Sequence, residues 1–450
     1  MPWEQKLMRT VRCRNSLARG TLARLLTAVS LEGGSIGEIR IIKEGLQAIV
    51  RDITVFADNR DQLEAIIAAM ESNPGTTVLE VRDEVLELHQ KGKIAIRSRY
   101  KIDSLATLRR VYTPGVAEVC LQIAKNPSLA RRYTVTSHLV AIVTDGTAIL
   151  GLGDIGPLAG MPVMEGKAML METLVGLSGV PILLNTKDPD EIVETVAHIA
   201  PTFAAIQLED ISAPRCFEIE NRLQEALDIP VIHDDQHGTA VVTTAALMVA
   251  AHSQGIALQD VRIGQIGLGA AGMATARMLM KYTGNPVLGA DLSEDAMQRF
   301  VAGGGQPSTL PEIMAQADIV VATTGVAGLI KPEMVRKGQI ILALSNPNPE
   351  IEPDDALAAG AAFAADGKSV NNVLGFPGIL RGAIDAYAPY VSDEMYLAAA
   401  ETLASLTPAG ELAPNPLNKD IHEAVARAVA ATAIGQGLAR AEYIPYLEDY

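Results

Sequence analysis

The sequence has few cysteines and few aromatic residues. Its 450 residues include three cysteines, one tryptophan and six phenylalanines. Cys13, Cys120 and Cys216 lie far apart, form no CxxC pair and are odd in number, which argues against a disulfide framework and is typical of a reducing compartment. Because apolar residues still make up 48% of the chain, we expect an α/β interior rich in aliphatic side chains.

Long apolar runs and an excess of basic residues are also missing. No run reaches the ~18 apolar residues of a membrane span, and the first residues lack the apolar centre of a signal peptide. The formal net charge of −16 argues against nucleic acid or an anionic membrane surface as a partner. We therefore expect a soluble, cytoplasmic protein of two to three domains that binds small molecules.

The first 85 residues have the pattern of a small separate domain. Periodicity predicts strands over 7–13, 36–42, 49–56 and 76–81, and helices over 21–31 and 60–70. This βαββαβ order is the ferredoxin-like arrangement. It resembles an ACT domain, a regulatory module that pairs with a copy of itself and binds small metabolites. We interpret residues 1–85 as an ACT-like regulatory domain; an oligomerisation module without a ligand is the alternative.

Two short apolar runs in the middle of the chain each end in carboxylates. One run ends in Glu209 and Asp210, the other in Asp234 and Asp235, with a helical pattern over 214–227 between them. A strand, a helix and a strand in this length form a βαβ unit with parallel strands. The four acids would then meet at the carboxyl edge of the sheet, where open α/β sheets bind ligands.

Carboxylates this close repel one another unless they are protonated or bind a cation. An all-oxygen donor set favours a hard divalent ion, Mg²⁺ or Mn²⁺, over zinc. Two alternatives stay open. The acids could be helix caps and solvated loop residues, or His233 and His237, four residues apart at the strand end, could indicate zinc.

Two segments match the GxGxxG pattern. The first, Gly151, Gly153 and Gly156, is followed by two prolines, so we expect no helix N-terminus there to hold a pyrophosphate. We expect the next helix only after Lys167.

The second GxGxxG match, Gly267, Gly269 and Gly272, follows a predicted strand and opens a helical pattern over 270–282. This context predicts a dinucleotide site, with Asp291 at the end of the next strand accepting a hydrogen bond from a ribose 2′-hydroxyl. An acid there would repel a 2′-phosphate, which favours NAD over NADP. A structural glycine-rich turn is the alternative.

Several short motifs together resemble the malic enzyme family. They occur in order between about residues 95 and 440: Tyr112-Thr-Pro-Gly-Val, Leu150-Gly-Leu-Gly-Asp154, Glu165-Gly-Lys167, Leu208-Glu-Asp210, His233-Asp-Asp235, Gly238-Thr-Ala240, Ser345-Asn-Pro347 and Asn371-Asn372. The resemblance implies an α/β substrate domain over residues 86–240. It also implies a Rossmann-type NAD-binding domain with C-terminal helices over 241–450.

The same resemblance implies the metal site and the base. Glu209, Asp210 and Asp235 would be the metal ligands. Lys167 would remove the C2 hydroxyl proton of malate, assisted by Asp234. A lysine acts as a base only when its pKa falls well below ~10.4, so we expect burial or a nearby cation to lower the pKa of Lys167.

Three further residues match substrate positions of the family. Tyr112 would protonate C3 of enolpyruvate, and Asn346 and Asn372 would hold the substrate carboxylate. Ala148 stands where many longer members have a substrate-contacting arginine, so another cation must replace it, or the metal and the asparagines suffice.

The resemblance therefore implies oxidative decarboxylation of malate to pyruvate and CO₂ with reduction of NAD, dependent on Mg²⁺ or Mn²⁺. We expect a homodimer or larger homo-oligomer, and for the ACT-like N-terminal domain we hypothesise regulation by a small metabolite. The alternatives are a malolactic-type enzyme that keeps NAD bound and releases lactate, and a catalytically silent metabolite sensor.

Overall fold

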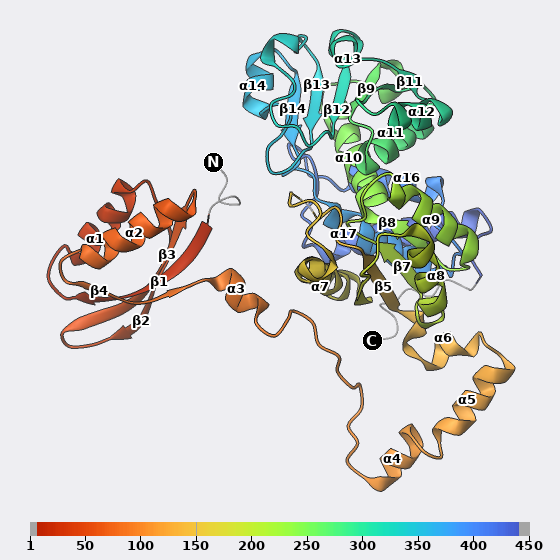
Figure 1. Cartoon of the computed structure of the whole chain (residues 1–450), viewed down its shortest axis with the longest axis horizontal. Helices are drawn as coiled ribbons and strands as arrows, with labels where there is room; N and C mark the ends of the chain where they lie inside the picture. Colours follow the sequence, from red (N-terminus) through yellow and green to blue (C-terminus); the bar gives the residue numbers. More distant parts are fainter. Residues whose placement is uncertain (1–6, 150, 441–450) are drawn as a thin grey trace. The chain divides into compact units, whose positions relative to one another are not determined.

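A computed structural model describes residues 7–149 and 151–440, which divide into two compact units after Ala95 (Figure 1). Leu150, the first residue of one predicted motif, lies outside the described residues. Among the residues described, no helix is both long enough and apolar enough to cross a membrane.

The first unit is a four-stranded antiparallel sheet with two helices, followed by the short helix α3 (Glu84–His89). Its elements are β1 (Leu7–Ser16), α1 (Thr21–Leu31), β2 (Ser35–Glu44), β3 (Ala48–Ala57), α2 (Arg60–Ser72) and β4 (Thr76–Arg82), in the sheet order β2-β3-β1-β4. Alternate residues of the two central strands, such as Val11 and Ile53, pack against Leu25 and Ile66 of the helices. This alternation is what the period of two in the sequence predicts.

The second unit begins with small helices and then forms a parallel sheet. The helices are α4 (Leu105–Val111), α5 (Val116–Lys125) and α6 (Leu129–Tyr133). The sheet has the order β6-β5-β7-β8, from β5 (Leu139–Thr144), β6 (Ser178–Leu183), β7 (Ala205–Leu208) and β8 (Val231–His233). The helices α7 (Pro157–Val175), α8 (Pro189–Ile199) and α9 (Arg215–Ala226) connect its strands.

The helix α7 corrects one prediction from the sequence. We expected the prolines after Gly156 to exclude a helix there, but α7 begins at Pro157 and contains Pro162. Proline is well suited to the first position of a helix, because the N–H that it lacks would have no partner there. The early start places Lys167 within the helix instead of in front of it.

A second parallel sheet has the order β11-β10-β9-β12-β13-β14. Its strands are β9 (Ile263–Ile266), β10 (Leu288–Ala290), β11 (Gln306–Pro307), β12 (Ile319–Ala322), β13 (Ile340–Ala343) and β14 (Phe363–Asp366). The helices between and after them are α11 (Ala270–Thr283), α12 (Glu294–Ala302), α13 (Leu310–Gln316) and α14 (Pro353–Ala358). The central strands β9, β12 and β13 are buried along their whole length, as the unbroken apolar sequences of β12 and β13 predict.

The helix α10 (Asp234–Ser253) contacts both β8 of the first parallel sheet and α11 of the second (Figure 1). It begins directly after β8, so Asp234 and Asp235 lie in its first turn. The C-terminal helices α15 (Phe376–Asp385), α16 (Asp393–Ser405) and α17 (Lys419–Gly435) complete the unit, and α16 packs against α10.

Candidate active site at the ends of β7 and β8

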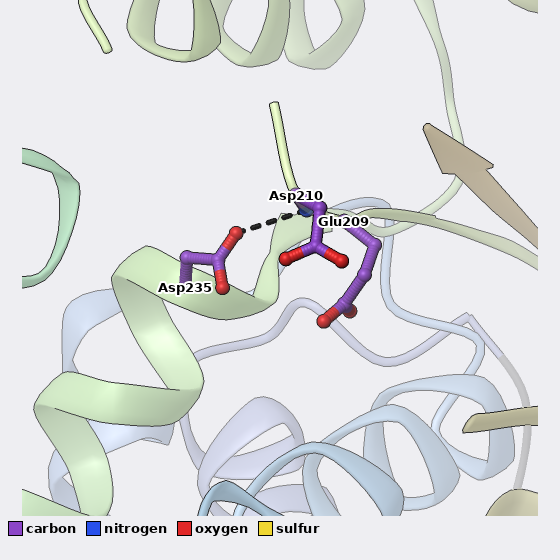
Figure 2. A group of neighbouring side chains, drawn as sticks. All are labelled: Glu209, Asp210 and Asp235. Atoms are coloured by element: carbon purple, nitrogen blue, oxygen red, sulfur yellow. Dashed lines mark hydrogen bonds between the residues drawn. The ribbon is translucent and has the colours of Figure 1, made fainter. Parts of the chain in front are cut away.

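The parallel pairing of β7 and β8 places two pairs of acids at one edge of the sheet. Leu208 lies opposite His233, so the residues after each strand emerge side by side. One carboxylate oxygen from each of Glu209, Asp210 and Asp235 lies within 4.8 Å of the other two (Figure 2). The acids that the sequence predicts to meet are therefore neighbours.

The backbone holds Asp210 in an unusual conformation. Its φ angle is +53°, in the left-handed region that non-glycine residues rarely adopt. Its N–H donates to Asp235 Oδ2 at 3.0 Å (Figure 2). Its carbonyl accepts from the N–H of Ala148 at 2.9 Å. The Oδ2 atom of Asp210 is buried and makes no hydrogen bond within the described chain. This arrangement leaves a buried carboxylate oxygen available to a ligand.

The electrostatics of the three acids favour a cation. Burial raises the pKa of Asp210 to about 7, and the negative charge of Asp235 adds to this effect. Burial also raises the pKa of Glu209 well above its ordinary value, with Asp234 and Asp235 adding to it. A doubly charged ion would relieve this repulsion, and the all-oxygen donors fit Mg²⁺ or Mn²⁺.

Neither histidine joins the oxygen cluster. The His233 ring is fully buried, with Nε2 3.5 Å from Asp235 Oδ2, while His237 Nε2 lies 2.9 Å from Glu220 Oε1. Among the described residues, the only group of His, Cys, Asp or Glu with metal-ligand spacing contains oxygen donors alone. The zinc interpretation is therefore not favoured.

Lys167 lies against this cluster. Its Nζ is 2.9 Å from Glu209 Oε1 and hydrogen-bonds to the buried carboxylate of Asp234, and it stands 4.5 Å from the centre of the Phe376 ring. Burial alone would lower the pKa of Lys167, but the charges of Asp234 and Glu209 outweigh it and raise this pKa. In the chain without a metal ion, burial therefore does not result in a lowered pKa of Lys167.

Asp234 is fixed in the first turn of α10. Its side chain is fully buried, and burial raises its pKa against the lowering effect of Lys167. A Cβ atom on Gly238 would lie 2.0 Å from Asp234 Oδ1, so only glycine leaves room for this carboxylate. The packing against Asp234 therefore explains why a glycine stands at position 238.

The two predicted asparagines lie on separate segments: Asn346 lies in the loop after β13, and Asn372 begins a short 3₁₀ helix, Asn372–Leu374. Asn372 donates from Nδ2 to Thr239 Oγ1 of α10 at 2.8 Å, which places it beside the helix that begins at Asp234. Asn346 follows β13, and its Nδ2 would lie 2.6 Å from a Cβ atom on Gly367. The structure ties Asn372 to the first turns of α10 and Asn346 to the loop after β14.

Tyr112 is not part of the cluster. It ends α4 and is 68% exposed, whereas Lys167 and the acids are largely buried. All residues of α4 and α5 are described, and none of them is buried. Within a single chain, the structure does not bring the predicted acid to the predicted base.

The second glycine-rich loop has the geometry expected of a strand–loop–helix phosphate site. Gly267 has a φ of +87°, and a Cβ atom on Gly272 would lie 1.9 Å from the Gly267 carbonyl oxygen. Asp291 Oδ2 accepts from the N–H of Leu268 at 2.7 Å, and its Oδ1 from the N–H of Ser293 at 2.8 Å. Asp291 therefore braces the loop, a role that sequence reasoning did not foresee.

Two further charged residues near the site were not singled out from the sequence. Glu220 of α9 is buried and accepts hydrogen bonds from the N–H of His233 at 2.8 Å and from Gln236, which fixes the start of α10. Arg215 donates to Asp145 and Thr147, both at 2.9 Å, directly beside Ala148. Each occupies an ordinary helix position in the sequence, and no local pattern marks it.

Comparisons with known proteins find similarity over most of the chain. The family model "Malic enzyme, N-terminal domain" matches residues 91–224, and "Malic enzyme, NAD binding domain" matches residues 296–436. The chain is 56% identical over 430 residues to NAD-dependent malic enzyme 1 of Bacillus subtilis (strain 168), covering 95% of this chain and 98% of that protein. It is 42% identical to the NAD-dependent malic enzyme of Geobacillus stearothermophilus, covering 94% and 93%. The crystal structure of a malic enzyme from Pyrococcus horikoshii Ot3 matches with a TM-score of 0.76 at 39% identity, over 80% of this chain and 92% of that one.

Proposed function

The chain belongs to the malic enzyme family, and we propose that the cluster around Lys167 is the site where it oxidises and decarboxylates malate with NAD. The reaction converts malate and NAD⁺ to pyruvate, CO₂ and NADH. The observation that carries the assignment of the site is the contact of Lys167 with both Asp234 and Glu209, beside three carboxylates that crowd one volume.

Glu209, Asp210 and Asp235 are the proposed ligands of Mg²⁺ or Mn²⁺. The unpaired Oδ2 atom of Asp210 and the raised carboxyl pKa values of Asp210 and Glu209 support this set. When bound, the ion would supply a Lewis acid that stabilises negative charge on the C2 oxygen during oxidation and during loss of CO₂.

Lys167 is the proposed base for the C2 hydroxyl proton, and Asp234 is the group that orients it. Glu209 and Asp234 together raise the lysine pKa. Since Glu209 is also a proposed metal ligand, its charge would be shared with the ion in the working enzyme. The pKa of Lys167 would then be lower than in the chain alone, which brings a neutral amine within reach near neutral pH.

The loop at Gly267, Gly269 and Gly272 is the proposed site of the NAD pyrophosphate, and Asp291 both braces this loop and favours a ribose without a 2′-phosphate. Bound NAD would supply the hydride acceptor. Asn346 and Asn372 are the proposed donors to the malate carboxylate.

Tyr112 is the proposed acid that protonates C3 of the enol product. It is 68% exposed in the single chain, and a proton donor in this reaction must face a site from which water is largely excluded. We therefore propose a homodimer or larger homo-oligomer whose subunit contact covers α4 and α5 and completes the site.

The N-terminal unit is proposed as a ferredoxin-like, ACT-like regulatory domain over residues 1–85, ahead of a substrate domain over 86–240 and an NAD-binding domain over 241–450. The antiparallel order β2-β3-β1-β4 supports the first assignment. The junction at residue 240 lies inside α10, which would carry motion between the last two domains.

Deleting residues 1–85 should leave malate oxidation intact and remove any response of the activity to a panel of small metabolites. A shortened chain that keeps this response would contradict the regulatory role.

The direct test is an assay of the purified chain with malate, NAD⁺ and Mn²⁺, in which both NADH and the organic product are measured. Stoichiometric NADH and pyruvate are expected. Lactate without free NADH would establish the malolactic-type alternative. If neither pyruvate nor lactate forms, the catalytically silent sensor is the remaining alternative.

A further inference from the structure

Glu350 is a fully buried carboxylate outside the metal cluster, and its partners carry no positive charge. Its Oε1 accepts from Thr324 N at 2.6 Å, Thr324 Oγ1 at 2.8 Å and Ser345 Oγ at 2.5 Å. Its Oε2 accepts from Ser345 N at 3.3 Å. Four donors face the two oxygens of this side chain, an arrangement that a carboxylate satisfies and that an amide or an apolar group cannot.

The donors come from the loops after two neighbouring strands. Thr324 follows β12 and Ser345 follows β13, whose last residues are paired in the parallel sheet. Ser345 Oγ also accepts from the N–H of Gly325 at 2.7 Å, which joins the two loops a second time. Glu350 thus fixes the relative position of two loops that leave the same edge of the sheet.

These loops lead to both halves of the proposed site. On one side, Thr323 Oγ1 donates to the carbonyl of Gly267 in the glycine-rich loop at 3.2 Å. On the other side, Ser345 is bonded directly to Asn346, the proposed donor to the malate carboxylate. Glu350 therefore stands between the cofactor loop and the substrate amide, although it touches neither ligand site itself.

We propose that Glu350 is a positioning residue that holds Asn346 at a fixed position relative to the dinucleotide loop. Glu350 would thereby set the distance between bound malate and the nicotinamide. The inference rests on the proposed roles of Asn346 and of the loop at Gly267. Since catalysis by orientation is lost with small displacements, loosening this anchor should weaken malate binding and turnover more than it weakens the fold.

The variant E350Q should affect the hydrogen bonds that Glu350 accepts from Thr324 and from Ser345 differently. An amide oxygen at the Oε1 position keeps three donors, but the amide nitrogen at the Oε2 position then faces the N–H of Ser345, donor against donor. The Thr324 side should stay in place and the Ser345–Asn346 side should shift. We expect the malate KM to rise roughly tenfold with the Kd of NADH changed less than about twofold. E352Q, at an exposed position two residues on with no side-chain cap hydrogen bond, is the matched control and should behave as the unmodified enzyme.

A second pair of variants keeps the proposal testable if E350Q does not fold. T324V removes one hydroxyl donor to Glu350 Oε1 on the cofactor side, so it should raise the Kd of NADH more than the malate KM. T324S keeps the hydroxyl and should have the Kd of NADH of the unmodified enzyme. A malate KM for E350Q equal to that of E352Q would overturn the proposal. So would equal losses for malate and NADH accompanied by a lower melting temperature, because that result indicates a merely structural role. If the unmodified chain does not oxidise malate, or if N346A leaves the malate KM unchanged, the proposed function fails instead.

Discussion

At the scale of single residues, the site depends on charges that would be unfavourable if each were buried alone. Lys167 contacts both Glu209 and Asp234, and desolvation works against the charged form of all three. Removing one member of such a group leaves the others unbalanced. A substitution at Lys167 should therefore affect the chemistry of the site far more than the remote cofactor loop.

The variant K167A should reduce malate oxidation by roughly 10²–10⁴-fold, the usual contribution of a positioned acid–base group. Binding of NADH, followed by its fluorescence, should change little because the glycine-rich loop does not contact Lys167. K337A, at an exposed lysine just before β13, is the control. Turnover by K167A at the unmodified rate would remove the assignment of the base.

The acids were predictable from the sequence, whereas their anchors were not. Glu209, Asp210 and Asp235 directly follow apolar strands, and the parallel geometry of a βαβ unit then places them together. Glu220 and Glu350 act through partners on other elements, and no local spacing records those contacts. The direction of the Lys167 pKa shift also depends on two carboxylates far away in sequence, Asp234 and Glu209, which outweigh burial in the chain without a metal ion.

At the scale of elements, helix starts decide where the reactive groups point. The helix α10 begins at Asp234, so two carboxylates lie in its first turn, where the helix dipole favours negative charge. The strands and helices of residues 7–82 follow the expected pattern closely, because each has a clear period and a turn signal. The start of α7 was missed because two prolines were read as helix breakers, although the first turn accepts proline.

The helix α17 carries a buried histidine that should make stability depend on pH. His422 Nε2 donates to the carbonyl of Pro416 at 2.8 Å, and burial lowers the His422 pKa below its usual 6.5. Below pH 6.5 the unfolded chain binds a proton that the folded chain does not, so stability is lost as pH falls from 6.5 through the folded pKa. The free energy of unfolding should fall by up to about 1.4 kcal/mol per pH unit in this window.

The variant H422Q keeps an N–H that can donate to Pro416 but does not titrate. Urea unfolding at pH 7, 6 and 5 should therefore show a smaller loss of stability for H422Q than for the unmodified chain. Burial also lowers the pKa of His138, so part of the pH dependence should remain. Equal slopes for both proteins would show that His422 does not contribute.

At the scale of the whole molecule, the proposed proton donor Tyr112 is exposed in a single chain. Tyr112 is 68% exposed, and apolar neighbours on the same helices, such as Leu105 and Leu121, are 73% and 58% exposed. In the proposed homo-oligomer, the subunit contact would cover this surface. The motif at Tyr112 is visible in the sequence, but the proposed contact that would bring Tyr112 to a Lys167 involves a second copy of the chain, and no motif encodes such a surface.

Mixing two inactive variants tests this assembly. Y112F lacks the proton donor and K167A lacks the base, so neither should turn over malate alone. If Tyr112 serves the site of a second copy, randomly paired dimers should recover about a quarter of the unmodified activity, because half are mixed and each mixed dimer holds one intact site. A mixture with no activity, despite proven subunit exchange, would place Tyr112 in the site of its own chain.

Manganese binding to the three carboxylates is the claim on which the proposed chemistry depends, and titration of free Mn²⁺ by electron paramagnetic resonance measures it without turnover. The unmodified chain should bind one ion per subunit, and D235N should weaken that binding at least about tenfold. D354N, at an exposed acid of α14, should bind as the unmodified chain does. Identical titrations for D235N and the unmodified protein would contradict the metal site.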